Sequence, residues 1–257
     1  MISIKNISYN VGKTAIIKNI AFNILPGEFT MILGKNGSGK STLLKLISAA
    51  INPTSGDIFY ENEKLSSLKT AEIAKRRAVL SQRTDVHFPI TAKEIVMMGR
   101  YPHFNFSPNK IDEDIIHETM QLMDVEKFAE RNYLTLSGGE KQRVQFARVL
   151  AQIWNISQDD VSYLFMDEPL TGLDIQHQLS FLKIAKSLLH KKLVLVAVMH
   201  DLNFAMQYAD NVVFLKDGNL IAFGKPKEIV TADLIENVFY VNSRFVDDGR
   251  MIVFEGK

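Results

Sequence analysis

The chain contains no cysteine and no excess of charge of either sign. With no cysteine among its 257 residues, it can form no disulfide, no thiolate metal site and no cysteine nucleophile. Its 30 basic residues are balanced by 29 acidic ones, whereas nucleic-acid binders usually carry a strongly basic domain or stripe. We therefore predict that nucleic acid is not a partner.

Long hydrophobic runs are also missing. The longest apolar stretch, at 193–199, fits a buried strand of a parallel sheet and is far shorter than the roughly 20 residues that cross a bilayer. The first six residues contain no apolar segment of the kind that a signal peptide needs. If the protein works at a membrane, we expect another chain to cross that membrane.

The most informative feature that is present is the segment 34–41, which reads Gly-Lys-Asn-Gly-Ser-Gly-Lys-Ser. It lies between an apolar run at 29–33, expected to be a strand, and 42–50, expected to be a helix. Glycines let backbone N–H groups surround phosphate oxygens, and the helix N-terminus adds partial positive charge. A glycine-rich turn with an incidental lysine would not explain the full pattern, so we predict a nucleoside triphosphate site. The residues expected to contact the nucleotide are Gly34, Lys35, Asn36, Gly37, Ser38, Gly39, Lys40, Ser41 and Thr42.

The rest of the chain has the pattern of an α/β fold. The first 30 residues alternate short apolar segments with turn residues, which suggests a small antiparallel sheet. Strand-like runs at 161–166, 193–199 and 211–215, separated by helical patterns, predict a parallel sheet with covering helices. A helix at 231–238 and a short strand at 251–254 are expected in the tail.

Residues 83–135 differ in character from the segments around them. Thr91 and Glu94 have the spacing of a helix capping box, and apolar residues further along keep helical spacing. We therefore predict one domain over the whole chain, with a nucleotide-binding core at 1–82 and 136–257 and a helical insertion at 83–135.

A second chemical feature is the pair of adjacent carboxylates Asp167 and Glu168, which follow the apolar run 163–166. Neighbouring side chains on a strand point in different directions. Asp167 can therefore bind Mg²⁺ through a water molecule. Glu168 can then face the γ-phosphate and polarise the attacking water. Paired acids often merely end a strand, but the glycine loop upstream favours the catalytic interpretation.

Residues 136–140, Leu-Ser-Gly-Gly-Glu, open a helix that is expected to reach about residue 151. Ser137 and Glu140 form the pattern of a capping box, which by itself could explain a helix start. Gly138 and Gly139, however, each cost about 1 kcal/mol relative to alanine in a helix. They are better explained if an anion must approach bare backbone, so we predict a second phosphate-binding site here.

Taken in order, these motifs resemble those of the ATP-binding subunits of ABC transporters. The motifs are 34–41, Gln82, 136–140, 163–168, 172–174 and His200. The match extends over nearly the whole chain, and Leu-Ser-Gly-Gly is highly specific to this family. It implies an α/β fold of the P-loop NTPase (RecA-like) type, with a parallel sheet, an N-terminal antiparallel β subdomain and an inserted α-helical subdomain.

The resemblance also implies the cofactors and the assembly. ATP and Mg²⁺ would be bound by a head-to-tail homodimer, in which the glycine loop of one subunit faces Ser137, Gly138, Gly139 and Glu140 of the other. Two permease subunits and a periplasmic or lipoprotein substrate-binding protein are the implied partners. The expected location is the cytoplasmic face of the inner membrane, where the protein would be peripheral.

Individual roles follow from the same resemblance. Tyr9 resembles the aromatic residue that stacks on adenine, with a core tyrosine of a small sheet as the alternative. Asp174 resembles the dimer-contact aspartate, and His200 resembles the switch histidine that contacts the γ-phosphate. Catalysis is assigned to Glu168, His200 and Lys40. The implied metal ligands are Ser41, Gln82 and Asp167.

Two segments depart from the usual family pattern. Glu140 stands where many relatives have glutamine, and 170–174 reads Leu-Thr-Gly-Leu-Asp where Thr-Ser-Ala-Leu-Asp is more familiar. Gly172 in the second segment could loosen the dimer-contact loop. Neither change removes a catalytic group, so the resemblance still implies an active ATPase.

The cargo is suggested by weaker marks. Residues 98–103 look like a Gly-Arg-x-Pro-His stretch in subunits that serve iron-chelate, cobalamin and haem importers, and 88–91 and 147–154 are similar to the haem-import group. Haem import is therefore expected, with ferric-siderophore or cobalamin import as alternatives. Trp154 and the Pro-His pair could instead be packing features shared across the wider group.

The implied cycle couples ATP to the permease. Two ATP molecules close the dimer, closure moves the helical insertion and the Gln82 region against the permease, and Glu168 positions water for attack on the γ-phosphate. Two other classes remain as distant alternatives: a soluble ABC-type ATPase acting on DNA or ribosomes, and an assembly factor for iron–sulfur clusters. The stretch 98–103 favours the importer.

Overall fold

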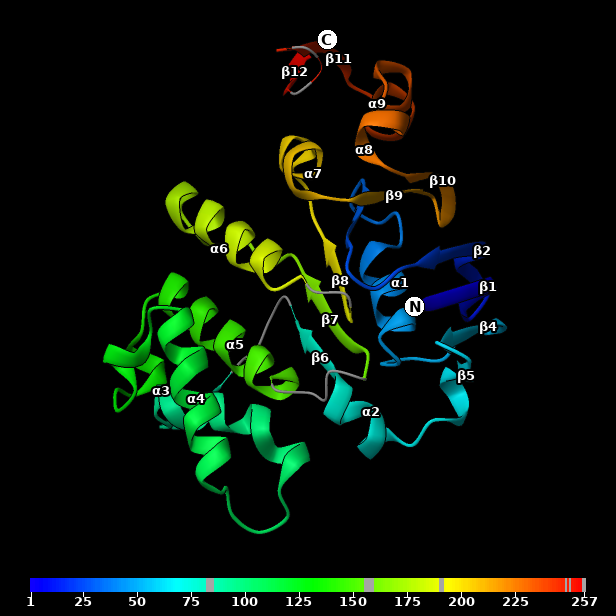
Figure 1. Ribbon diagram of the computed structural model, residues 1–257. Coiled ribbons are helices and arrows are strands. Elements are labelled where there is room, and N and C mark those ends of the chain that lie inside the picture. Colours follow the sequence, from blue (N-terminus) through cyan, green and yellow to red (C-terminus); the bar gives the residue numbers. More distant parts are fainter. Residues whose placement is uncertain (82–85, 155–159, 190–191, 248, 250, 256–257) are drawn as a thin grey trace. The chain divides into compact units, whose positions relative to one another are not determined.

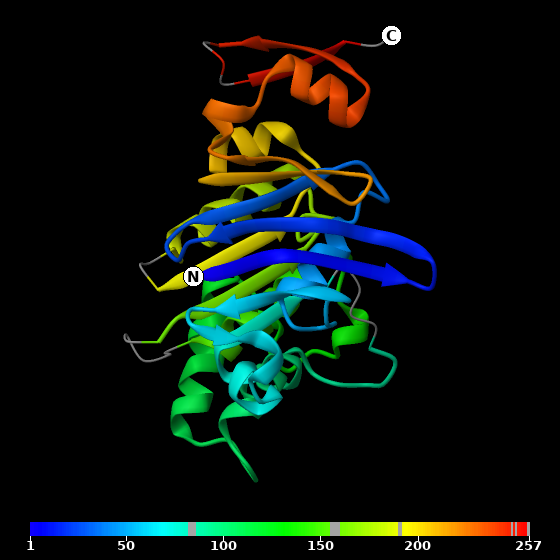
Figure 2. The same cartoon turned by 90° about the vertical axis from the view of Figure 1, so that its right-hand side faces the viewer.

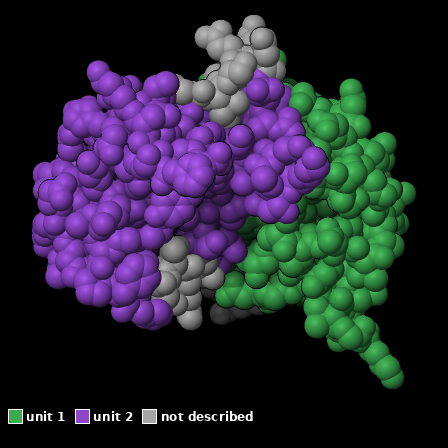
Figure 3. All heavy atoms as spheres, turned by 90° about the horizontal axis from the view of Figure 1, so that it is seen from below, with its two compact units in different colours: residues 1–68, 188–257 green, residues 69–187 purple. Residues whose placement is uncertain are grey.

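In the computed structural model the chain forms two compact units (Figure 3). Unit 1 consists of Met1–Leu68 and Leu188–Lys257, and unit 2 consists of Lys69–Ser187. The structure describes residues 1–81, 86–154, 160–189, 192–247, 249 and 251–255.

A mainly parallel sheet forms the centre of unit 1 (Figure 1). Its strands lie in the order β10-β9-β3-β8, and β3 pairs in parallel with both β8 and β9. Their bounds are β3 Phe29–Gly34, β8 Leu193–Val198, β9 Asn211–Lys216 and β10 Asn219–Gly224. Every residue of β3 and β8 is buried, as expected for apolar strands covered on both faces. These strands confirm the predicted ones, except that β10, which is half-exposed, was not predicted from the sequence.

The predicted antiparallel sheet is also present in unit 1. Its strands lie in the order β2-β1-β4-β5, and Figure 2 shows the long strands β1 and β2 side by side. Their bounds are β1 Ile2–Val11, β2 Thr14–Ile24, β4 Ser55–Tyr60 and β5 Glu63–Lys64. A ring contact with a centroid distance of 5.0 Å joins Phe22 of β2 to Phe223 of β10.

The helices of unit 1 cover these sheets, and a hairpin follows the last of them. The elements are α1 Lys40–Ile47, a 3₁₀ turn at Leu65–Ser67, α7 Leu202–Tyr208, α8 Pro226–Ile229, α9 Ala232–Phe239, β11 Asn242–Val246 and β12 Met251–Glu255. Helix α1 starts at Lys40, directly after the glycine loop, and stops before Ala49, whose φ of 58° is left-handed. The expected helix at 42–50 is therefore correct in kind and shifted in its bounds. The tail contains the expected helix and strand, but it also contains β11, which was not predicted.

Unit 2 combines two parallel strands with helices. The strands are β6 Arg77–Leu80 and β7 Ser162–Asp167, and the helices are α2 Thr70–Arg76, α3 Ala92–Met97, α4 Lys110–Leu122, α5 Gly138–Ile153 and α6 Ile175–Ser187. The described part of unit 2 also contains 3₁₀ turns at Met98–His103, Glu126–Phe128 and Tyr133–Thr135. The capping boxes at Thr91 and Ser137 are both formed, which confirms the predicted starts of α3 and α5.

The 3₁₀ turn at Met98–His103 is fixed to its neighbours by buried polar contacts. Arg100 Nε donates to Asp112 Oδ1 at 2.9 Å, and Arg100 Nη1 donates to the Ala151 carbonyl at 2.7 Å. His103 Nε2 lies 2.8 Å from the Gln152 carbonyl oxygen, and burial lowers the pKa of this imidazole. In this chain the stretch therefore has a structural role of its own.

Gly99 illustrates how tightly that turn packs on α5. A Cβ atom placed on Gly99 would lie 2.1 Å from the Arg148 carbonyl oxygen, so backbone would have to move. We expect Gly99→Ala to lower the free energy of unfolding by about 1–3 kcal/mol, as overpacked substitutions typically do, measured by urea denaturation. The matched control is Gly138→Ala at the start of α5, the helix on which the turn packs, where a Cβ meets no atom within 4 Å. Equal stability of the Gly99 variant and the wild type would contradict this packing.

No helix in the part of the chain that the structure describes combines the length and the hydropathy needed to cross a membrane.

Candidate nucleotide-binding site

The loop between β3 and α1 is organised around a buried ammonium group. Lys40 is only 6% exposed, and its Nζ donates to the Gly34 carbonyl at 2.9 Å and to the Lys35 carbonyl at 3.0 Å. A buried charge is stable only when it is paired or hydrogen-bonded. The loop therefore holds a positive charge at the N-terminus of α1, ready for an anionic ligand.

Two glycines of this loop are required by the backbone path itself. Gly34, with a φ of 151°, would place a Cβ 2.3 Å from the Leu215 carbonyl oxygen, so only glycine lets β3 turn against β9 here. Gly37 has a φ of 80°, and a Cβ there would meet no atom within 4 Å. Its surroundings are therefore open, which leaves room for a ligand to approach the backbone.

The loop also contains polar groups whose hydrogen bonds a phosphate group would complete. Among the described residues, the buried Ser38 Oγ has no hydrogen-bond partner. The N-cap of α1 is Gly39, which provides no side-chain cap, and the first turn contains no acidic residue. Phosphate oxygens would satisfy such groups, since a helix N-terminus stabilises negative charge.

Two distant segments of unit 1 support the loop from outside. The Gly218 N–H donates to the Ser38 carbonyl at 3.1 Å, and the Lys18 N–H donates to the Gly218 carbonyl at 2.8 Å. A Cβ on Gly218 would lie 2.4 Å from the Ile16 carbonyl oxygen. This contact was not predicted, although Asp217 and Gly218 between two apolar runs form a known hairpin signal.

Tyr9 and His200 belong to the same unit as the loop. Tyr9 on β1 pairs with Ile17 of β2, whose Cδ1 would lie 2.8 Å from a Cβ on Gly39. His200 is exposed and follows β8, where the Met199 N–H donates to the Ile32 carbonyl of β3 at 3.1 Å. Both positions are thus attached to strands that lead to or support the glycine loop.

The two predicted carboxylates lie at the end of β7 in unit 2. Asp167 is the last residue of the strand and is 9% exposed. Glu168 follows with a φ of 51°, a left-handed conformation that is uncommon for residues other than glycine. Such strain persists where surrounding structure holds it, and it is concentrated at functional sites. The backbone conformation at Glu168 is thus consistent with a functional position directly after β7.

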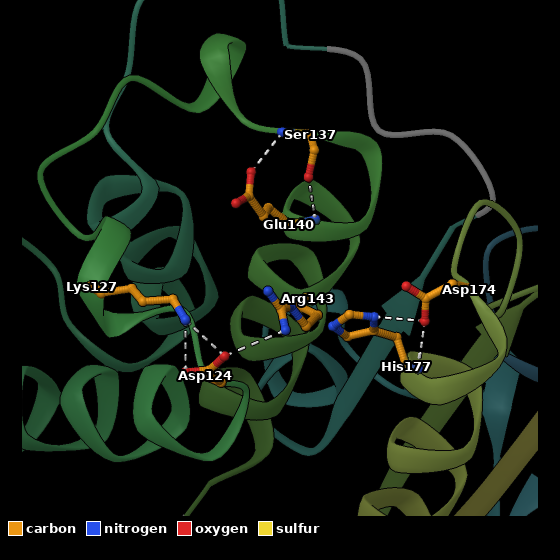
Figure 4. Close-up of polar contacts among 7 residues, drawn as sticks. All are labelled: Asp124, Lys127, Ser137, Glu140, Arg143, Asp174 and His177. Carbon is orange, nitrogen blue, oxygen red and sulfur yellow. Dashed lines mark hydrogen bonds and ion pairs between the residues drawn. The ribbon is translucent and has the colours of Figure 1, made fainter.

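The glycine pair at the start of α5 has no structural explanation within the described chain (Figure 4). The Ser137 N–H donates to Glu140 Oε2 at 2.8 Å, and the Glu140 N–H donates to Ser137 Oγ at 3.3 Å. Hydrogen bonds from the Ser137 backbone N–H and side chain to the Glu140 carboxylate lower its pKa. A Cβ on Gly138 would meet no atom within 4 Å, and one on Gly139 would make an ordinary contact of 3.6 Å with Leu173. The glycines leave bare backbone at a helix N-terminus, as the predicted second phosphate site requires.

Asp174 has a local partner in the turn before α6. Its Oδ1 accepts from the His177 N–H at 2.9 Å and lies 2.8 Å from His177 Nδ1, and these contacts lower the pKa of Asp174. Gly172 has a φ of 80°, so glycine suits this turn better than the alanine of the more familiar sequence. The carboxylate of Asp174 therefore orders the turn while staying at the surface.

Close to this turn, Arg143 of α5 forms a charged cluster with two residues that follow α4, which the sequence did not reveal (Figure 4). Arg143 Nη1 lies 3.6 Å from Asp124 Oδ2, and Lys127 Nζ lies 3.0 Å from the same oxygen. Arg143 and His177 both line a cavity of about 220 Å³. This cluster links the helix that starts at Ser137 to the turn that follows α4.

The structure locates two of the three predicted metal ligands. Ser41 is half-buried in the first turn of α1, and Asp167 ends β7. Gln82 lies outside the described residues. Across the described ranges, no cluster of three or more histidine, cysteine, aspartate or glutamate residues could hold a metal ion.

Comparison with known proteins gives consistent relationships. Residues 17–171 match the family model described as ABC transporter. The hemin import ATP-binding protein HmuV of Gloeobacter violaceus is 44% identical, with 87% of this chain and 82% of that protein covered. The protein of the same name from Methylobacillus flagellatus is 39% identical, with 93% and 89% covered. A dimeric post-hydrolysis structure of the ATP-binding cassette MJ0796 bound to ADP and Pi is 28% identical, with a TM-score of 0.76 over 89% of this chain and all of that one.

Proposed function

Since this chain belongs to the ABC transporter family, we propose that it is the ATP-hydrolysing subunit of an importer that takes up haem. The observation that carries the ATPase function is the glycine loop with its buried ammonium group, Lys40. The loop has the form of a phosphate site, and the family gives that site ATP as its ligand. The parallel sheet and the loop belong to the P-loop NTPase fold.

Each ATP would be held by the loop and by an aromatic ring. Lys40 leaves the carbonyls of Gly34 and Lys35 and pairs with the β- and γ-phosphates, while backbone N–H groups of the loop and Ser38 Oγ bind the remaining phosphate oxygens. Tyr9, which pairs with Ile17 across β1 and β2, stacks on adenine.

A second copy of the chain would complete each site. The exposed backbone at Gly138 and Gly139 binds the phosphates held by the loop of the other subunit. This supports a head-to-tail homodimer, because nothing in the described part of the same chain accounts for two glycines in that helix turn. Asp174, at the surface before α6, contacts the opposing subunit.

Hydrolysis would then depend on a small set of side chains. Glu168, whose backbone is left-handed directly after β7, orients the attacking water. Lys40 and His200 offset the negative charge that develops on the γ-phosphate oxygens. Catalysis in this proposal consists of positioning and electrostatic stabilisation.

The donors present fit Mg²⁺, which prefers oxygen ligands and usually keeps several waters and substrate phosphates. The Ser41 hydroxyl and the Asp167 carboxylate would hold it, together with Gln82. When bound, the ion neutralises phosphate charge.

Haem is the proposed cargo because curated relatives at 38–44% identity are hemin import ATP-binding proteins. Two permease subunits and a periplasmic or lipoprotein substrate-binding protein would complete the importer. The homodimer would lie at the cytoplasmic face of the inner membrane, because the permease provides the membrane-spanning part.

The cargo is tested with vesicles that contain the cognate permease and this subunit. We expect haem, delivered with the substrate-binding protein, to stimulate ATP hydrolysis several-fold more than a ferric siderophore or cobalamin does. The measurement is phosphate release at saturating ATP. Vesicles carrying the Glu168→Gln variant are the background control, and stimulation by cobalamin or a siderophore alone would overturn the haem assignment while leaving the ATPase assignment intact.

A further inference from the structure

The residue that follows α9, Tyr240, holds two lysine side chains with its ring. Lys35 Nζ lies 4.3 Å from the ring centroid, and Lys216 Nζ lies 4.7 Å from it. Tyr240 is 51% exposed and has a left-handed φ of 61°. An ammonium group within about 6 Å of an aromatic ring centroid is attracted by the negative face of the ring. The end of α9 is thus a small cation-binding platform made by one aromatic side chain.

One of the two lysines ties α9 to the central sheet. Lys216, the last residue of β9, donates to the Asn237 carbonyl at 2.7 Å and to Asn237 Oδ1 at 2.8 Å. A cation at the C-terminus of a helix is favourable because the last carbonyls and the helix dipole are negative there. Phe239 and Phe214 pack edge to face with ring centroids 6.3 Å apart. These contacts fix the position of Tyr240 relative to β9.

The other lysine belongs to the glycine loop. The Lys35 carbonyl accepts from Lys40 Nζ at 3.0 Å and from the Ser38 N–H at 3.1 Å. The same residue therefore provides the carbonyl that organises the loop and the side chain that Tyr240 holds. Because Lys35 is exposed, its side chain would lose its fixed position without the ring.

We propose that Tyr240 is a positioning residue of the phosphate loop, which it orders through Lys35 so that the C-terminal segment sets the affinity for ATP. This inference rests on the proposed ATPase function. Tyr240 lies beyond the residues 17–171 that match the family model, and it belongs to none of the motifs that carry the resemblance to the family. A loop ordered in advance loses less conformational freedom when a ligand binds. Tyr240 thus acts on binding, whereas Glu168 acts on hydrolysis.

The test compares two substitutions at Tyr240. We expect Tyr240→Leu to raise the Kd and the KM for ATP about two- to fivefold, the effect of one exposed cation–π contact, with kcat unchanged. Tyr240→Phe keeps the ring and should retain wild-type affinity. All three residues occupy the same left-handed backbone position, so its strain is matched among them. Affinity is measured by calorimetry with Mg-ATP, and hydrolysis by phosphate release.

Two further variants separate this role from general stability. Phe254→Leu removes a similarly exposed ring from the same C-terminal segment and should leave ATP affinity unchanged. Tyr240→Leu should add no further loss to Lys35→Met, because contacting residues are energetically coupled. Unchanged affinity in Tyr240→Leu, or a fully additive loss in the double variant, would overturn the proposal. If the wild-type protein itself did not bind ATP, the proposed function would fail instead.

Discussion

Glu168→Gln is expected to bind ATP normally and to hydrolyse it at least about 100-fold more slowly than the wild type, since a positioned general base contributes roughly 10²–10⁴-fold. The amide has the size of the carboxylate but cannot polarise the attacking water in the same way. The left-handed backbone at this position, with a φ of 51°, is equally strained for both residues. The fold and the nucleotide site should therefore stay intact, so the loss should appear in kcat.

The same variant also tests the composite site. Because bound ATP remains intact, Glu168→Gln should accumulate as a homodimer in Mg-ATP and return to a monomer when nucleotide is removed, measured by light scattering after gel filtration. Glu130→Gln removes the charge of an exposed glutamate in the same unit and is the matched control. Robust turnover by Glu168→Gln would remove Glu168 from its role. Full activity of a strictly monomeric wild-type protein would contradict the shared site.

Lys40→Ala should weaken ATP binding by roughly 10- to 100-fold, because hydrogen bonds to charged groups contribute about 1.5–3 kcal/mol each. Lys40, which is 6% exposed, lies at the N-terminus of α1, where no side chain caps the helix. Removing it leaves the phosphates with backbone donors but without the paired charge. The Kd for Mg-ATP, measured by calorimetry, should therefore increase strongly.

Two companion variants make this result specific. Lys45→Ala removes an exposed lysine from the same helix and should keep wild-type affinity. Lys40→Met retains most of the side-chain volume while removing the charge, so it should lose affinity as Lys40→Ala does. Unchanged nucleotide binding in both Lys40 variants would contradict the assignment of the loop as the phosphate site.

Much of the fold was predictable because its signals are local. The strands β3 and β8 are continuous apolar runs, and α3 and α5 start at capping boxes that can be read from three or four adjacent residues. β10 and β11 were missed because none of their residues is fully buried, so neither strand belongs to the apolar core that marks β3 and β8 in the sequence. The end of α1 was placed too late, since the left-handed turn at Ala49 carries no glycine to mark it.

The family and the ATPase function were likewise predicted correctly from motifs, and the matches to the ABC transporter family confirm them. The roles of individual residues such as Tyr9, His200 and Asp174 stay predictions until the variants are measured. For Asp174 the structure adds the contact with His177, which the sequence did not suggest.

The sequence by itself determined the family, and it predicts where phosphate binds and which side chains carry the chemistry, because a glycine loop, a paired carboxylate and a capped glycine turn are each formed by adjacent residues. Only the tertiary structure decided what supports them. Gly218 meets Ile16 and Ser38, and Tyr240 meets Lys35, across long stretches of chain. Such contacts depend on how strands and helices are brought together in space, and neither residue type nor spacing encodes them locally.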